Sequence, residues 1–132
     1  MISHVFVGVT DFQRAFGFYS AIMEVLDLQL KFCDADKPWA AWMANGKARP
    51  LFIIGSPYSG EAAAGNGQMI ALLAPTRTAV DKAYAAALRN GGSCEGAPGL
   101  RLEYHPDYYG AYFRDADGNK LCVCCHDAPG AA

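Results

Sequence analysis

Hydrophobic residues recur along the first half of the chain in short strand-like runs around one helical pattern. Residues 2–9 form the first run, and their β-branched and aromatic side chains predict a strand. Apolar residues then recur at intervals of three and four, which predicts one buried helix face made of Phe12, Phe16, Tyr19, Met23 and Leu26. Thr10 and Gln13 have the spacing of a capping box at the start of that helix. Three further strands are expected, at residues 28–33, 39–44 and 51–54.

The same order of elements recurs in the second half, after a stretch rich in glycine and alanine. A strand is expected at residues 68–73, and then a helix with a possible capping pair at Thr78 and Asp81. The apolar side of that helix is Val80, Tyr84, Ala87 and Leu88, with its end at Gly91-Gly92. The last three strands are expected at residues 94–104, 109–114 and 120–126.

The predicted fold class is therefore α+β, with two βαβββ modules in one domain of 132 residues. We expect the first module at residues 1–54, a linker at 55–66, the second module at 67–127 and a disordered tail at 128–132. The content of 52% hydrophobic and 18% charged residues is sufficient for a hydrophobic core.

Net charge and cysteine usage narrow the functional classes. The charge is -2 with scattered Lys and Arg, so neither nucleic acid nor a membrane surface is expected as a partner. No apolar run approaches the ~20 residues of a membrane span. Cys122 and Cys124 would lie ~6.6 Å apart along one strand, which is poor disulfide geometry. The five cysteines therefore indicate reduced thiols and a cytoplasmic location.

Several segments together resemble one protein family. They are His4 on the opening strand, Thr10-Asp11 before the first helix, Phe18-Tyr19 within it, and the run from Phe113 to Leu121, which contains Asp-Ala-Asp-Gly-Asn. This pattern is similar to the vicinal oxygen chelate superfamily, which includes glyoxalases, bleomycin-resistance proteins and extradiol dioxygenases. Residues 98–111 resemble a bacterial glyoxalase-like branch. The resemblance implies a curled mixed sheet around a central cup, and a homodimer.

The resemblance also implies one divalent metal, with His4, Gln68 and Cys122 at the ligand positions. Strand spacing alone favours a structural role for His4, whereas its position in the family favours a residue that lines the cavity, with metal ligation as the alternative. A thiol in place of the family's carboxylate favours Zn²⁺, with Ni²⁺ or Mn²⁺ also open, or no metal at all. The absence of the second His and of the Glu argues against an extradiol dioxygenase. Cys122, Cys124 and His126 share one strand face but span ~13 Å, too wide for a single ion.

Aromatic residues with nearby cations predict a binding surface for a flat or anionic organic molecule. The candidate ligand-binding residues are Trp39, Trp42, Arg101, Tyr104, Tyr108 and Tyr112. The two tryptophans are three positions apart on a strand, so they should face opposite sides. Two functions follow from the resemblance: a metal-assisted lyase or isomerase of the lactoylglutathione-lyase type, or a metal-free protein that binds and sequesters a small molecule.

Overall fold

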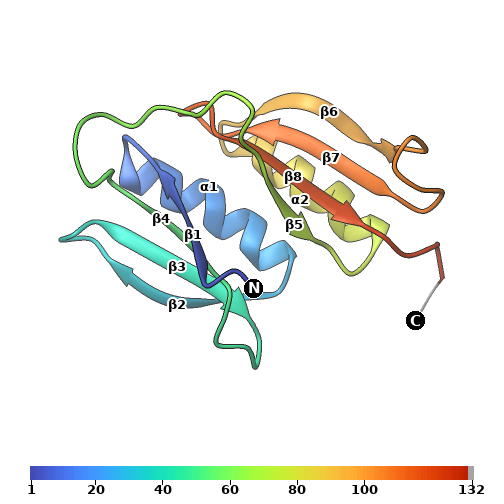
Figure 1. Cartoon of the computed structure of the whole chain (residues 1–132), viewed down its shortest axis with the longest axis horizontal. Coiled ribbons are helices and arrows are strands. Elements are labelled where there is room, and N and C mark those ends of the chain that lie inside the picture. Colours follow the sequence, from blue (N-terminus) through green and yellow to red (C-terminus); the bar gives the residue numbers. More distant parts are fainter. Residues whose placement is uncertain (131–132) are drawn as a thin grey trace.

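Each half of the chain folds into a four-stranded sheet with one helix against it (Figure 1). The structure is a computed structural model and describes residues 1–130. The first module contains β1 (His4–Gly8), α1 (Phe12–Val25), β2 (Leu28–Asp34), β3 (Trp39–Ala44) and β4 (Leu51–Gly55). The second contains β5 (Ile70–Leu73), α2 (Arg77–Arg89), β6 (Ser93–Leu100), β7 (Tyr109–Arg114) and β8 (Lys120–Cys125). The predicted βαβββ repeat is confirmed.

In each sheet, the first strand of the module pairs in parallel with the last, and the other pairs are antiparallel. The strand orders are β1-β4-β3-β2 and β5-β8-β7-β6. Helices α1 and α2 contact each other on one side of the two sheets (Figure 1). We call the opposite side of each sheet its open face. The two sheets do not close into a barrel.

The helix-facing residues of both modules form one hydrophobic core. Along β1, Val5 and Val7 face this core, whereas His4 and Phe6 lie on the open face, as strand alternation predicts. Helix α2 packs through alanines and Val80, which leaves Leu88 38% exposed. The expectation that Leu88 belongs to the buried side was therefore wrong, because the small residues set the rotation of this helix.

Both helix starts differ from the sequence prediction. Helix α1 is capped by Asp11, whose carboxylate accepts from the backbone N–H of Arg14 at 3.1 Å. Helix α2 is capped by Thr76, which lies before the predicted pair and accepts from the N–H of Ala79 at 3.0 Å. A cap residue needs an extended backbone and a short side chain that reaches back over the first turn. Several neighbouring Thr and Asp residues meet the second condition, and only the fold decides the first.

The turn at residues 115–119 joins the second module to the first. Asp115 is 6% exposed and accepts from the hydroxyl of Tyr19 at 2.6 Å and from the side-chain amide of Asn119 at 2.9 Å. The same amide of Asn119 donates to the carbonyl of Gly8 at 3.0 Å, and the N–H of Thr10 donates to Asp117. The Asp-Ala-Asp-Gly-Asn sequence is therefore a clasp between modules.

The segment between β6 and β7 is a folded-back loop. The strand expected to reach residue 104 ends at Leu100, and the N–H of Arg101 donates to the carbonyl of Tyr108 at 2.8 Å, which closes the loop. This closure returns residues 101–108 to the edge of the open face. The tail expected at 128–132 lies in part outside the described residues, and no helix within residues 1–130 is long and apolar enough to cross a membrane.

Candidate functional site

A hydrogen-bonded pair of tyrosines lies on the open face of the second sheet. The hydroxyls of Tyr108 and Tyr112 are 3.0 Å apart, and the Tyr108 hydroxyl lies 3.5 Å from the sulfur of Cys122 on the neighbouring strand. Strands β7 and β8 place Tyr112 directly opposite Cys122. The two tyrosine side chains therefore cover the thiol of Cys122, which is fully buried. Burial raises the pKa of both tyrosines, so both hydroxyls keep their protons as donors.

Two glycines leave the space that the side chains of Tyr108, Tyr112 and Arg101 occupy. A Cβ on Gly110 would be 2.9 Å from the ring of Tyr108, and a Cβ on Gly96 would be 3.2 Å from the ring of Tyr112. The latter would also be 3.1 Å from a guanidinium nitrogen of Arg101. The irregular, glycine-rich course of β6, with its register shifts around Gly96, therefore allows Arg101 to lie over the sheet.

Two cations flank the ring of Tyr112. The Arg101 guanidinium carbon is 5.4 Å from the ring centroid, and the Lys120 ammonium is 5.7 Å from it. Arg101 is steadied by donating to the carbonyl of Ala97 at 2.8 Å. Neither cation takes part in an ion pair among the described residues, since the ion pairs there are Arg77 with Asp107 and Arg114 with Glu95. This face therefore carries positive charge next to aromatic surface.

A cavity of about 570 Å³ adjoins this face along the seam between the two sheets. Its walls come from β1, from the segment before β5 and from the start of β8, and they include Phe6, Gln68, Met69, Asn119 and Lys120. Lys120 thus connects the cavity with the tyrosine pair. The Gln68 side chain lies against Gly65, where a Cβ would collide with its amide oxygen.

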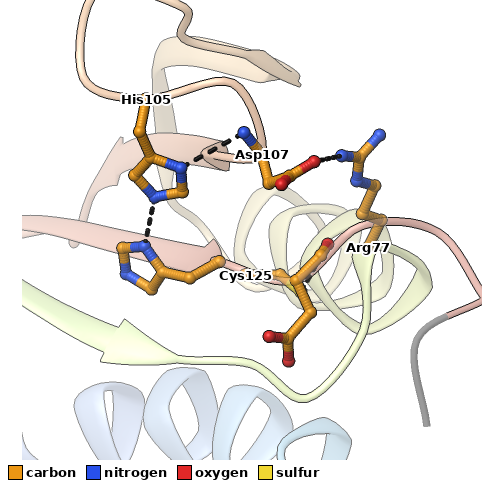
Figure 2. A network of polar contacts seen from close by, with 6 residues as sticks. Arg77, His105, Asp107 and Cys125 are labelled. Carbon is orange, nitrogen blue, oxygen red and sulfur yellow. Dashed lines mark hydrogen bonds and ion pairs between the residues drawn. The ribbon is translucent and has the colours of Figure 1, made fainter.

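A chain of thiol and imidazole groups runs along the other end of the same face. The sulfur of Cys124 is 3.6 Å from Nε2 of His126, and Nδ1 of His126 is 2.8 Å from Nε2 of His105. Figure 2 shows His105 held from its other side by Asp107, whose N–H donates to Nδ1 of His105 at 3.1 Å and whose carboxylate pairs with Arg77. Strand spacing places Cys124 and His126 on one face, and the loop between β6 and β7 adds His105 to them.

The two thiols of this face differ in their pKa values. The Cys122 thiol two positions away, helped by Tyr108 and His126, lowers the pKa of Cys124 to about 6 against the effect of burial. The reverse holds for Cys122, since its contact with Cys124 and its burial raise its pKa. Cys122 therefore retains the proton, and Cys124 is the thiol more readily ionised. All cysteines of the chain are free, as expected.

The remaining candidate ligand-binding residues fall in three different places. Tyr104 is 63% exposed, with its ring centroid 4.9 Å from that of Tyr108, so it extends the aromatic surface outward. Trp39 and Trp42 face opposite sides of the first sheet, as predicted. Trp42 is 3% exposed and stacks on Phe16 of α1, so it belongs to the core and does not line the open face. Trp39 lies on the open face of the first sheet.

The three candidate metal ligands have separate surroundings. His4 contacts the hydroxyl of Ser3 through Nδ1, Gln68 lines the seam cavity, and Cys122 lies under Tyr108. Within residues 1–130 no group of three His, Cys, Asp or Glu side chains is placed to hold a metal ion. A thiol must lose its proton to bind a metal, whereas the surroundings of Cys122 favour the protonated form. The donor set as placed does not fit a metal ion, and the expected divalent metal stays a prediction.

Comparison with known proteins places this fold in a family. The model of the Glyoxalase/Bleomycin resistance protein/Dioxygenase superfamily matches residues 1–123. A glyoxalase/bleomycin resistance protein from Albidiferax ferrireducens T118 is 32% identical, with a TM-score of 0.83 over 95% of this chain and 98% of that one. No curated protein matches the chain.

More distant solved structures share the fold. A glyoxalase-related enzyme from Fulvimarina pelagi is 14% identical, with a TM-score of 0.70 over 95% of this chain and 87% of that one. TnmS3, an antibiotic binding protein from Streptomyces sp. CB03234, is 21% identical, with a TM-score of 0.60 over 96% of each chain. The family match over residues 1–123 and the closely similar Albidiferax structure agree with the paired-module architecture. This chain therefore belongs to the glyoxalase/bleomycin resistance protein/dioxygenase superfamily.

Proposed function

We propose that this protein binds a planar, negatively charged organic molecule on the open face of its second sheet, without the help of a metal ion. The observation that carries this proposal is the placement of Arg101 and Lys120 on the ring of Tyr112, next to the Tyr108–Tyr112 hydroxyl pair. A flat ligand would stack against the exposed aromatic surface, its anionic group would meet the two cations, and one hydroxyl of the tyrosine pair would donate to it.

The fold is compatible with a binding role, since TnmS3, which shares it, is described as an antibiotic binding protein. The alternative is a metal-assisted lyase or isomerase of the lactoylglutathione-lyase type. Such an enzyme stabilises developing negative charge on substrate oxygens with its metal. We rank this second because the donors at His4, Gln68 and Cys122 do not converge.

The homodimer is part of the same family expectation and is open to sedimentation analysis.

The test is a thermal-shift and calorimetric comparison of 2-naphthoate and other aromatic carboxylates with their uncharged amides. We expect the carboxylates to raise the melting temperature by mass action and the amides to do so less. Arg101→Gln should weaken the affinity by about tenfold or more, since a hydrogen bond to a charged group contributes about 1.5–3 kcal/mol. Arg89→Gln, at the exposed end of α2, is the matched control and should bind as the parent does.

Treatment with EDTA separates the two candidate functions. Binding that survives metal removal supports the proposal. Binding that disappears with EDTA and returns with Zn²⁺ or Ni²⁺ would favour the lyase alternative, to be followed by an assay on a hemithioacetal substrate. Equal affinity for acids and amides, or an Arg101→Gln protein that binds normally, would rule out the site as described.

A further inference from the structure

The imidazoles beside Cys124 have a defined direction of hydrogen bonding. The N–H of Asp107 donates to Nδ1 of His105, so that nitrogen carries no proton and Nε2 of a neutral His105 must carry one. This proton points at Nδ1 of His126, 2.8 Å away, which must then accept. The remaining nitrogen of His126, Nε2, therefore carries the N–H and presents it to the sulfur of Cys124 at 3.6 Å.

A hydrogen-bond donor aimed at sulfur stabilises the thiolate, which is the reactive form of cysteine. A proton on Nδ1 of His126 would place two N–H groups head to head across the 2.8 Å contact with His105, so His105 fixes the tautomer of His126. Asp107 is itself anchored by the ion pair with Arg77 at 3.6 Å. The backbone N–H of Asp107 thus fixes the direction of both hydrogen bonds between it and the Cys124 sulfur, although it does not contact that sulfur.

We propose that Cys124 is a nucleophilic site that forms covalent adducts with small electrophiles, such as α,β-unsaturated carbonyl compounds, with His126 and His105 as positioning residues. The thiolate sulfur adds to the β-carbon and forms a carbon–sulfur bond as the carbon–carbon π bond breaks. The electron pair moves to the carbonyl as an enolate, which takes a proton from water at the α-carbon. The thiol proton leaves to solvent, so the net product is a thioether and no oxidant or further reactant is needed.

The neighbouring thiols lack this arrangement. Cys122 lies 3.5 Å from the hydroxyl of Tyr108 and is 0% exposed. Cys125 points to the other side of β8, and its thiol donates to the carbonyl of Asp127. Cys124 is 4% exposed, and the imidazole that contacts its sulfur, that of His126, is itself exposed at the end of β8. The proposal therefore requires a small electrophile that approaches Cys124 from the open face beside His126.

N-ethylmaleimide is the probe for this site. The exposed Cys33 and Cys94 are first replaced, as C33S/C94S, so that only the three thiols of β8 remain. We expect one equivalent to be incorporated, fragment mass spectrometry to place it on Cys124, and Cys124→Ser to abolish it. His126→Phe should slow the labelling by about tenfold to a hundredfold through loss of the donor to the thiolate. If His126 had only a structural role, a His126→Phe protein with an unchanged melting temperature would be labelled at the parent rate.

His105 provides the matched pair of variants. His105→Gln can still accept from the Asp107 N–H and donate to His126, so labelling should stay within about threefold of the parent, whereas His105→Phe should slow it as His126→Phe does. Labelling of Cys122 or Cys125 in preference to Cys124, no labelling at all, or equal rates in both phenylalanine variants and the parent would overturn the proposal. The proposed ligand binding is tested with other variants and a non-covalent probe, so either idea can fail alone.

Discussion

Removal of one hydroxyl group from the inter-module clasp should destabilise the whole domain. Tyr19 is 0% exposed, and its hydroxyl donates to Asp115 at 2.6 Å. Burial and the carboxylate of Asp115 raise the pKa of Tyr19, so the phenol remains a donor across the accessible pH range. Tyr19→Phe deletes this hydrogen bond and leaves the ring in place.

The expected loss of stability follows from the hydrogen bonds that the Asp115 carboxylate retains in Tyr19→Phe. The Asp115 oxygen that Tyr19 contacts still accepts from the Asn119 amide, and the other oxygen still accepts from two backbone N–H groups. The loss is therefore that of one hydrogen bond to a charged group, about 2 kcal/mol. For a chain of 132 residues this corresponds to a melting temperature lower by about 8 °C.

The assay is urea unfolding followed by fluorescence, in which the buried Trp42 reports on the packing of the first module. Tyr58→Phe is the control, because Tyr58 is fully exposed and the same chemical change there should stay within about 0.5 kcal/mol. If Tyr19→Phe lost no more free energy of unfolding than Tyr58→Phe, the clasp would not contribute as argued.

Three further predictions follow from local geometry. Gly92→Ala should cost about 1–3 kcal/mol, because its Cβ would lie within 3.0 Å of two backbone carbonyls and a ring. Gly17→Ala, in open space on α1, should stabilise the protein by about 0.5–1 kcal/mol, and equal melting temperatures of the two variants would contradict this reasoning. Asp11→Ala should cost about 1 kcal/mol and Thr10→Ala almost nothing in urea unfolding, the reverse of what a cap at Thr10 requires. The rate of Cys124 alkylation should fall as the pH falls through about 6 and level off above about 7, because the rate follows the thiolate; a midpoint near 9 would refute the lowered pKa.

The sequence by itself determined the architecture, for a physical reason. Side-chain alternation on strands and the helical repeat are local properties, so residues such as Val5, Val7 and Tyr19 reveal their buried side wherever the elements pack. The same reasoning separated Trp39 from Trp42. It failed at Thr10 and Leu88, where neighbouring residues of similar type competed and only the packing of the helix chose between them.

The site depended on contacts between residues distant in the chain, which no local pattern contains. The tyrosines, Arg101 and Lys120 were brought together by a glycine-rich strand and a loop that closes between residues 101 and 108. The same loop carried His105 to His126 and so gave Cys124 its donor. The Asp-Ala-Asp-Gly-Asn motif was evident in the sequence as part of the family resemblance, but its role as a clasp required the first module beside it. Local periodicity therefore determined the elements, and tertiary closure decided the chemistry of the open face.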